Sequence, residues 1–418
     1  MFYESLAKSK GELDACGILL KGYVFGISIE VYDWQECFYI LKMFLMRTAQ
    51  LLSYQHLVQC AHRRATSTMG RHLLNGVIVT ELAGLAPVPF CGLVLADFGA
   101  EVTTVIHQSG KQIIEQRLTR GKQQKVVNLK RAEGVEELRK ICRTSDVLLD
   151  PFRPGVLEKM DLDPVDLIRD NNKLIVARIS GYGQTGELAS RAGHDINYVS
   201  LSGILPTING HSTNRLPYWP PANLLADFAG GGLMAAFGII AALYNRQQNG
   251  GSGCIIDVSM VEGVAYLSTF ITAYQDIDKM CNDPYAWFSG KSPIYRTYQT
   301  LDDKYVAVGA IEKKFAETLF KTLQLKSKLI DLEERPEVVN NEMETTFRTR
   351  TREEWTNLFN GVDACVTPVL DIKEVALLKH HQMRSAFTYD NNKFWPCPAP
   401  RFYTADDFAR LRDGKVKK

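Results

Sequence analysis

A strand, a turn, a helix and a second strand follow one another from residue 77, and this succession limits the folds open to the chain. Val77–Leu82 is predicted to be a buried strand, and the prolines of Gly84–Pro89 exclude its continuation. Phe90–Phe98 carries apolar residues at helical spacing, and Val102–Ile106 is the second strand. Such a βαβ unit requires parallel strands, so we expect an α/β fold.

Strands and helices continue to alternate up to residue 271. Further strands are expected at Lys125–Leu129, Asp146–Leu149, Leu174–Ile179 and Cys254–Asp257, and a helix is expected at Met260–Ile271. No GxGxxG motif follows the first strand, so a dinucleotide-binding site is not predicted.

The composition and the spacing of apolar residues change along the 418 residues, and these changes define the predicted segments. Apolar and polar residues alternate in Ile294–Thr300 and in Tyr305–Val308, which predicts a hairpin in a second and smaller domain. The predicted segments are an N-terminal extension (1–74), a large α/β domain (75–271), a linker (272–291), a small α+β domain (292–385) and a C-terminal return segment (386–418).

The N-terminal extension contains an acid-poor stretch that is rich in arginine. No Asp or Glu occurs between Cys37 and Thr80, a composition typical of organelle transit peptides. Because 45 residues precede Met46, two alternatives stay open: translation begins near Met46, or the extension is an accessory segment. We expect a mitochondrial or peroxisomal protein, although the C-terminus lacks a Ser-Lys-Leu-type peroxisomal signal.

Composition argues against several classes of function. The formal net charge is +2, so no nucleic acid is an expected partner. The candidates for a local phosphate site are the basic residues Arg120, Lys122, Lys130 and Lys159. The nine cysteines include no CxxC pair, which argues against disulfides and a zinc site, and no metal is expected. The longest uncharged run, Phe228–Tyr244, is short for a membrane span and contains four glycines, which favours a buried helix.

Three polar side chains lie where predicted elements change. His194 follows a Gly-rich turn and precedes a helical pattern, and an imidazole there can exchange a proton near neutral pH. Asp227 precedes the long uncharged run, and Glu312 lies between an alternating strand and a helix. For each residue alone a structural role at a helix start is the ordinary explanation.

Together these segments resemble the α-methylacyl-CoA racemases of the family III CoA-transferase (CaiB/BaiF-type) superfamily. The resemblance extends in one order from about Asn75 to about Pro400. The matching stretches are Leu85–Pro87, Leu95–Ala100, Arg120–Lys122, Ser145–Leu149, Phe152–Gly155, Gly193–Tyr198, Asn223–Gly232, Asp257–Gly263 and Val308–Glu312. The resemblance implies a Rossmann-like large domain that binds CoA, a smaller domain and an interlocked homodimer. Because the family chain ends in a further helical segment, the return segment is expected to be truncated.

The resemblance also implies the site residues. His194 and Asp227 match two acid–base groups that remove and return the α-proton of a thioester, and Glu312 matches the glutamate that partners the histidine. Main-chain amides near Asp195 would receive the enolate oxygen. The implied CoA and substrate contacts are Arg120, Val127, Asn128, Leu129, Lys130, Lys159, Gly193, Asp195, Ile196, Asn197 and Tyr198. His107 and Asn128 depart from the family, whose members carry arginine and aspartate there.

The implied reaction interconverts (2R)- and (2S)-2-methylacyl-CoA thioesters through an enolate, in branched fatty acid or bile acid metabolism. It needs no cofactor, since CoA is part of the substrate. One alternative is CoA transfer to a free acid with Asp227 as the covalent nucleophile. A protein without catalytic activity is another alternative. The segments around His194 and Glu312 favour the racemase.

Overall fold

The computed structural model describes two compact units, one formed by Met1–Thr66 and Lys373–Cys397 and the other by Ser67–Ile372 and Pro398–Lys418. The residues described are 20–24, 27–31, 72–107, 117–205, 222–248, 250–390 and 393–412. Met46 and the arginines of the predicted transit-like stretch lie outside them.

The first unit contains two antiparallel hairpins. Strands β1 (Leu20–Val24) and β2 (Ile27–Val31) pair with each other, as do β12 (Phe387–Asp390) and β13 (Lys393–Pro396). A turn of 3-10 helix, η5 (Val375–Leu377), and helix α15 (Lys379–Met383) precede the second hairpin.

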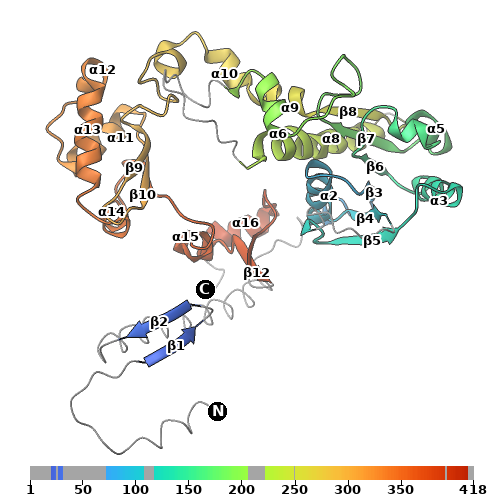
Figure 1. Ribbon diagram of the computed structural model, residues 1–418, viewed down its shortest axis with the longest axis horizontal. Helices are drawn as coiled ribbons and strands as arrows, with labels where there is room; N and C mark the ends of the chain where they lie inside the picture. Colours follow the sequence, from blue (N-terminus) through green and yellow to red (C-terminus); the bar gives the residue numbers. More distant parts are fainter. Residues whose placement is uncertain are drawn as a thin grey trace, which may run out of the picture. The chain divides into compact units, whose positions relative to one another are not determined.

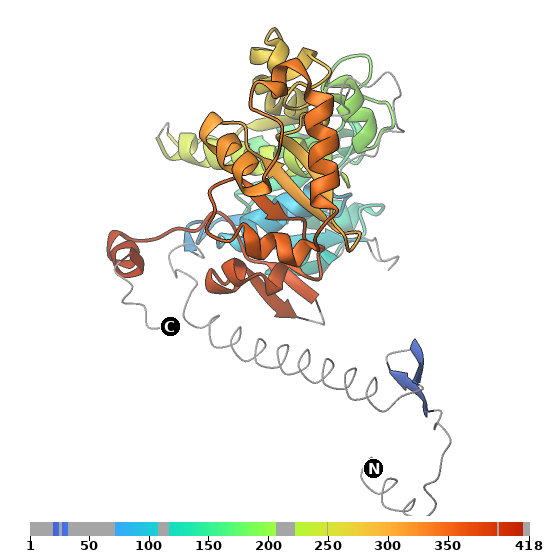
Figure 2. The ribbon, with the colours of Figure 1, turned by 90° about the vertical axis from the view of Figure 1, so that its left-hand side faces the viewer.

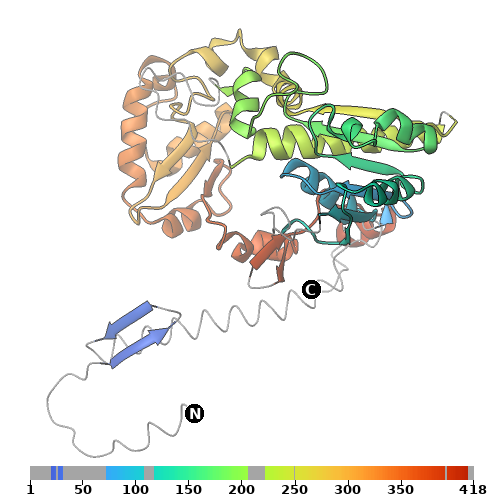
Figure 3. The same cartoon turned by 45° about the vertical axis from the view of Figure 1, so that its right-hand side comes forward.

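The second unit is built on a six-stranded sheet whose order is β5-β4-β3-β6-β7-β8 (Figure 3). All neighbouring strands are parallel, which confirms the α/β prediction. Their bounds are β3 (Ile78–Leu82), β4 (Glu101–Ile106), β5 (Lys122–Val126), β6 (Val147–Asp150), β7 (Ile175–Ser180) and β8 (Ile255–Ser259). The order changes direction between β3 and β6, so a ligand crevice is expected at the carboxyl ends of these two strands.

Helices cover both faces of this sheet (Figure 1). On one face α2 (Pro87–Asp97) and α8 (Met234–Gln248) pack against Val79, Leu149 and Ala177. On the other face α3 (Ala132–Cys142), α4 (Val156–Lys159) and α5 (Pro164–Asp170) pack against Leu82, Leu148 and Val176. Burying each of these valine and leucine side chains stabilises the fold by about 1.5–3 kcal/mol.

Several predicted boundaries were wrong. The helix predicted at Met260–Ile271 is divided into two helices at Ser268. Helix α2 begins at Pro87 rather than Phe90, because proline suits the first helical turn, where its missing N–H costs nothing. Strand β5 is Lys122–Val126 rather than Lys125–Leu129. It is an edge strand and mostly exposed, and apart from Val126 its residues are polar, so it carries no run of apolar residues.

The predicted buried helix at Phe228–Tyr244 lies within a longer helical segment, Leu224–Gln248. Its first part, η3 (Leu224–Leu233), is a π-helix that continues into α8. The glycines of η3 permit close packing, since a Cβ on Gly230 or Gly232 would lie within 3 Å of neighbouring atoms. By length and composition alone Leu224–Gln248 is also apolar enough to cross a membrane, a test that core helices of soluble proteins pass as well.

The chain beyond β8 builds a second core in the same unit (orange in Figure 2). Strands β9 (Tyr295–Gln299) and β10 (Tyr305–Gly309) pair antiparallel, which confirms the predicted hairpin, and β11 (Val366–Pro368) joins β10. Helices α12 (Asp331–Glu334) and α13 (Pro336–Phe347) were not predicted, because acidic and amide residues interrupt their apolar spacing. Among the described residues of this unit, the helices that follow β8 are α9 (Met260–Leu267), α10 (Thr269–Tyr274), η4 (Asp278–Asn282), α11 (Lys313–Leu323), α12 (Asp331–Glu334), α13 (Pro336–Phe347), α14 (Arg352–Leu358) and α16 (Ala405–Arg412).

Candidate active site

Loops that leave the carboxyl ends of the parallel strands enclose a cavity of about 310 Å³. The loop after β3 and the loop after β6 form one side, where the sheet order changes direction. They approach so closely that a Cβ on Gly84 would lie 2.3 Å from the Cβ of Pro151. The predicted acid–base residues His194 and Asp227 both line this cavity.

His194 lies where a loop becomes a helix, as predicted. It is the N-cap of α6 (Asp195–Leu201), with extended backbone, and its amide donates to Asn197 Oδ1 at 3.0 Å. The Tyr198 hydroxyl donates to the carbonyl of Gly193 at 2.5 Å and fixes the residue before the histidine. The backbone therefore positions His194, which is exposed and lines the cavity.

Asp227 lies in the first turn of η3 and is 9% exposed. It is not the N-cap of that helix, because Asn223 occupies that position with a left-handed φ of 61°. The structural explanation by N-capping is therefore excluded for this carboxylate. π-Helical turns are rare and are frequently found at functional sites.

Arginine and tyrosine side chains complete the cavity wall. Arg153, Arg191 and Tyr182 line it, and sequence analysis assigned none of them a role. Arg153 Nη1 donates to the carbonyl of Ser190 at 3.3 Å. Burial raises the pKa of Tyr198 to about 12, so its hydroxyl stays protonated. The available signal for Arg153 was its place in the family-like stretch Phe152–Gly155.

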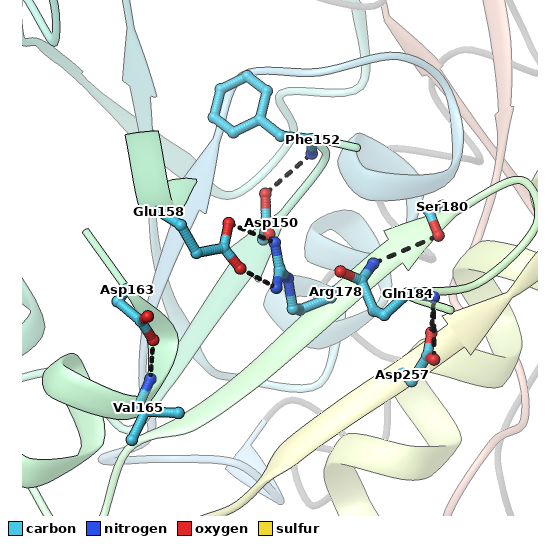
Figure 4. Close-up of polar contacts among 9 residues, drawn as sticks. All are labelled: Asp150, Phe152, Glu158, Asp163, Val165, Arg178, Ser180, Gln184 and Asp257. Carbon is cyan, nitrogen blue, oxygen red and sulfur yellow. Dashed lines mark hydrogen bonds and ion pairs between the residues drawn. The ribbon is translucent and has the colours of Figure 1, made fainter. Parts of the chain in front are cut away.

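An ionic network supports the wall formed by the loop after β6 (Figure 4). Arg178 on β7 donates from Nε to Asp150 Oδ2 at 2.9 Å and from Nη1 to Glu158 Oε1 at 2.7 Å. Asp150 Oδ1 accepts from the amide of Phe152 at 2.8 Å. Burial raises the pKa of Asp150 to about 6, against the opposing influence of Arg178. The network fixes the turn that presents Phe152 and Arg153 to the cavity.

A second set of polar contacts holds the Gly-rich turn that precedes His194 (Figure 4). The amide of Gln184 donates to both carboxylate oxygens of Asp257, at 3.2 and 3.0 Å. Gln184 Nε2 also contacts Ser180 Oγ at 3.4 Å. The turn is thus attached to the ends of β7 and β8.

The predicted CoA contacts fall at different places on the sheet. Residues 127–130 follow β5, and Lys159 ends α4, so both groups lie beyond carboxyl ends of strands. Lys130 donates its amide to Asn128 Oδ1 at 3.1 Å. Arg120 instead precedes β5, at the amino ends of the strands, and forms a two-bond ion pair with Asp97. The structure does not bring Arg120 together with the other predicted contacts.

Two other basic or acidic residues are also placed away from the cavity. Lys122 is buried in an ion pair with Glu81, so its ammonium group is not available to a phosphate. Glu312 is the exposed N-cap residue of α11 and is not among the residues that line the cavity. Within the described residues no cluster of three or more His, Cys, Asp or Glu side chains could hold a metal ion.

Comparison with known proteins identifies the family. The model of CoA-transferase family III matches residues 74–412. A CaiB/baiF CoA-transferase family protein of Caenorhabditis elegans is 53% identical, over 82% of this chain and 99% of that protein. Human alpha-methylacyl-CoA racemase is 47% identical, over 78% of this chain and 86% of its own. The crystal structure of a CaiB/BaiF family protein from Brucella suis has the same fold, with a TM-score of 0.61 at 19% identity over 85% of this chain and 100% of that one. The chain therefore belongs to CoA-transferase family III.

Proposed function

We propose that this protein is an acyl-CoA racemase that interconverts the (2R) and (2S) epimers of 2-methylacyl-CoA thioesters. The observation that carries the proposal is the presence of His194 and Asp227 in one cavity. Inversion of an α-carbon requires two groups on opposite faces, one to remove the proton and one to return it. The 47% identity to the human and mouse alpha-methylacyl-CoA racemases supports the same reaction.

In the proposed mechanism one of the two side chains removes the α-proton and the other protonates the opposite face. The negative charge that develops on the thioester oxygen is stabilised by main-chain amides near Asp195. All steps are proton transfers, so no cofactor is needed. We place the CoA phosphates near Val127–Lys130 and Lys159 and the substrate in branched fatty acid or bile acid metabolism, as the family resemblance implies.

The proposed assembly is an interlocked homodimer. Large apolar side chains on consecutive helices are exposed in the single chain, including Phe237 (67%) and Tyr266 (70%). Covering them with a second copy would remove apolar surface from water. We further propose that Glu312 reaches the histidine only in such an assembly. Light scattering should give twice the chain mass, and Phe237→Asp combined with Tyr266→Asp should lower it.

The decisive experiment follows α-proton exchange in deuterated water, starting separately from each pure epimer. Asp227→Asn should lower the exchange that begins with Asp227 by about 10²–10⁴-fold, and His194→Ala should lower the exchange from the other epimer. Glu312→Gln should give a weaker version of the His194→Ala result. Absence of α-deuteration by well-folded wild-type protein would falsify the proposal. A new CoA ester formed from an added free acid, with an acyl adduct on Asp227, would favour CoA transfer.

For the compartment we propose mitochondrial import directed by the acid-poor stretch. Residues 46–80 fused to a fluorescent reporter should then direct it to mitochondria. A diffuse cytosolic signal would contradict this and favour an accessory segment.

A further inference from the structure

The helix that carries Asp227 does not cap its own amino end. The first four amides of a helix have no partner within it, and a side chain at the N-cap usually accepts from one of them. Asn223 occupies the N-cap position of η3 with φ of 61° and makes no side-chain cap hydrogen bond. The backbone amide of Phe228 donates to the carbonyl of Asn223, at 3.4 Å.

A carboxylate from a different helix satisfies two of these amides. Asp195 Oδ1, on the first residue of α6, accepts from the amide of Ala226 at 2.7 Å and from the amide of Asp227 at 2.9 Å. Asp195 is 1% exposed, so both hydrogen bonds are shielded from water and assisted by its charge. A carboxylate at the amino end of a helix is also favoured by the helix dipole.

We propose that Asp195 is a positioning residue that sets the distance between the two acid–base groups. His194 is its neighbour in the chain, and Asp227 is bound through its own amide. The two groups are thus joined by one peptide unit and one hydrogen bond, although they come from separate helices. This role rests on the proposed function, and it matters because a misplacement of about 1 Å can lower a rate by about 10²-fold.

Two replacements separate positioning from general stability. Asp195→Ala removes the acceptor, whereas Asp195→Asn keeps an oxygen that can accept from both amides. Asp163→Ala is the matched control, because Asp163 Oδ1 caps α5 by accepting from the amide of Val165 at 2.8 Å (Figure 4). That cap lies outside the cavity, so its loss tests what an ordinary capping defect does.

The first measurement is amide hydrogen exchange by mass spectrometry, which does not depend on activity. Asp195→Ala should speed deuteration of peptides covering Ala226 and Asp227 at least tenfold, and Asp195→Asn should remain near the wild type. Asp163→Ala should speed exchange only around α5. Unchanged protection in Asp195→Ala would overturn the capping role.

The second measurement is α-proton exchange from each pure epimer. Asp195→Ala should lower the exchange that Asp227 begins by about 10–10²-fold and should change the exchange that His194 begins by less than about threefold. Asp195→Asn should recover most of the loss, and Asp163→Ala should leave the ratio of the two rates unchanged. An equal loss from both epimers would overturn the positioning role. If the wild-type protein exchanges neither epimer, the proposed function fails and this role with it, while amide protection still tests the cap.

Discussion

Two buried clusters of charge lie on the same parallel sheet, yet their surroundings differ. Glu81 on β3 and Lys122 on β5 pair at 2.7 Å beneath α2, with side chains that are 2% and 0% exposed. Arg178 on β7 pairs with Asp150 and with Glu158, which is 33% exposed, at the carboxyl end of the sheet beside the cavity. One cluster is enclosed by the core, whereas the other reaches the loops that line the cavity.

The enclosed cluster is satisfied almost entirely by protein atoms. Lys122 Nζ also donates to the carbonyl of Pro89 at 2.7 Å, and Thr104 Oγ1 donates to Glu81 Oε1 at 3.0 Å. Gly92 makes room for it, because a Cβ there would lie 1.8 Å from Glu81 Oε2. Burial raises the pKa of Glu81 and lowers the pKa of Lys122. Similar ion pairs on one sheet therefore stabilise the core in one place and support the wall of the cavity in another.

The largest effect is expected from breaking the enclosed pair. Lys122→Met leaves the Glu81 carboxylate buried without its partner, so the free energy of unfolding should fall by about 3–5 kcal/mol. Adding Glu81→Gln removes the uncompensated charge and should recover a large part of the loss. Urea unfolding of the single and double variants measures both, and a loss below about 1 kcal/mol in Lys122→Met would contradict the comparison.

Breaking the cluster beside the cavity should instead affect substrate binding. In Arg178→Met, Asp150 can take up a proton and Glu158 can turn to water, so we expect a smaller loss of about 1–3 kcal/mol. The turn bearing Phe152 and Arg153 loses its support, and KM for acyl-CoA should rise about tenfold, or about 1.4 kcal/mol. Steady-state kinetics checks this, with Lys122→Met as the control. A KM equal to that of the wild type would separate the network from the site.

The raised pKa of Asp150 should make the free energy of unfolding depend on pH through the cluster beside the cavity. Its pKa of about 6 in the folded protein lies above the ordinary 3.8, so between these values the folded state holds a proton that the unfolded state lacks. The contribution of this group to the free energy of unfolding should therefore fall as pH rises from about 4 to about 6, by at most about 3 kcal/mol, and stay constant above. Asp150→Asn should remove this dependence in urea unfolding at a series of pH values. Parallel curves for both proteins would contradict it.

The smallest effect is expected from a surface ion pair, which is a reference for the enclosed cluster and for the cluster beside the cavity. The side chains of Arg120 and Asp97 are 41% and 14% exposed, and such pairs contribute about 0–1 kcal/mol. Arg120→Met should change stability no more than that. Because Arg120 precedes β5, we also expect little change in KM, and a marked rise would restore the family-based prediction that it contacts CoA.

Much of the architecture could be predicted from the spacing of apolar residues and turns along the chain. The buried strands around Ile78–Leu82 and Ile175–Ser180 consist of apolar runs, and such runs bounded by turns are a strong local signal. His194 was correctly placed at a helix start because a Gly-rich turn precedes it and a helical pattern follows. By contrast, β5 is polar at the sheet edge, and its bounds depend on pairing with β4 rather than on its own residues.

Local pattern therefore specified the parallel sheet, its connections and three polar residues worth attention. It did not specify that Asp195 caps the helix of Asp227, that Arg178 joins two carboxylates beside the cavity, or that Lys122 is buried while Arg120 is not. Hydrophobic periodicity depends on near neighbours in the chain, so short stretches reveal it. Hydrogen bonds and ion pairs between distant segments exist only after the elements have packed, because packing alone sets their distances and removes the water around them.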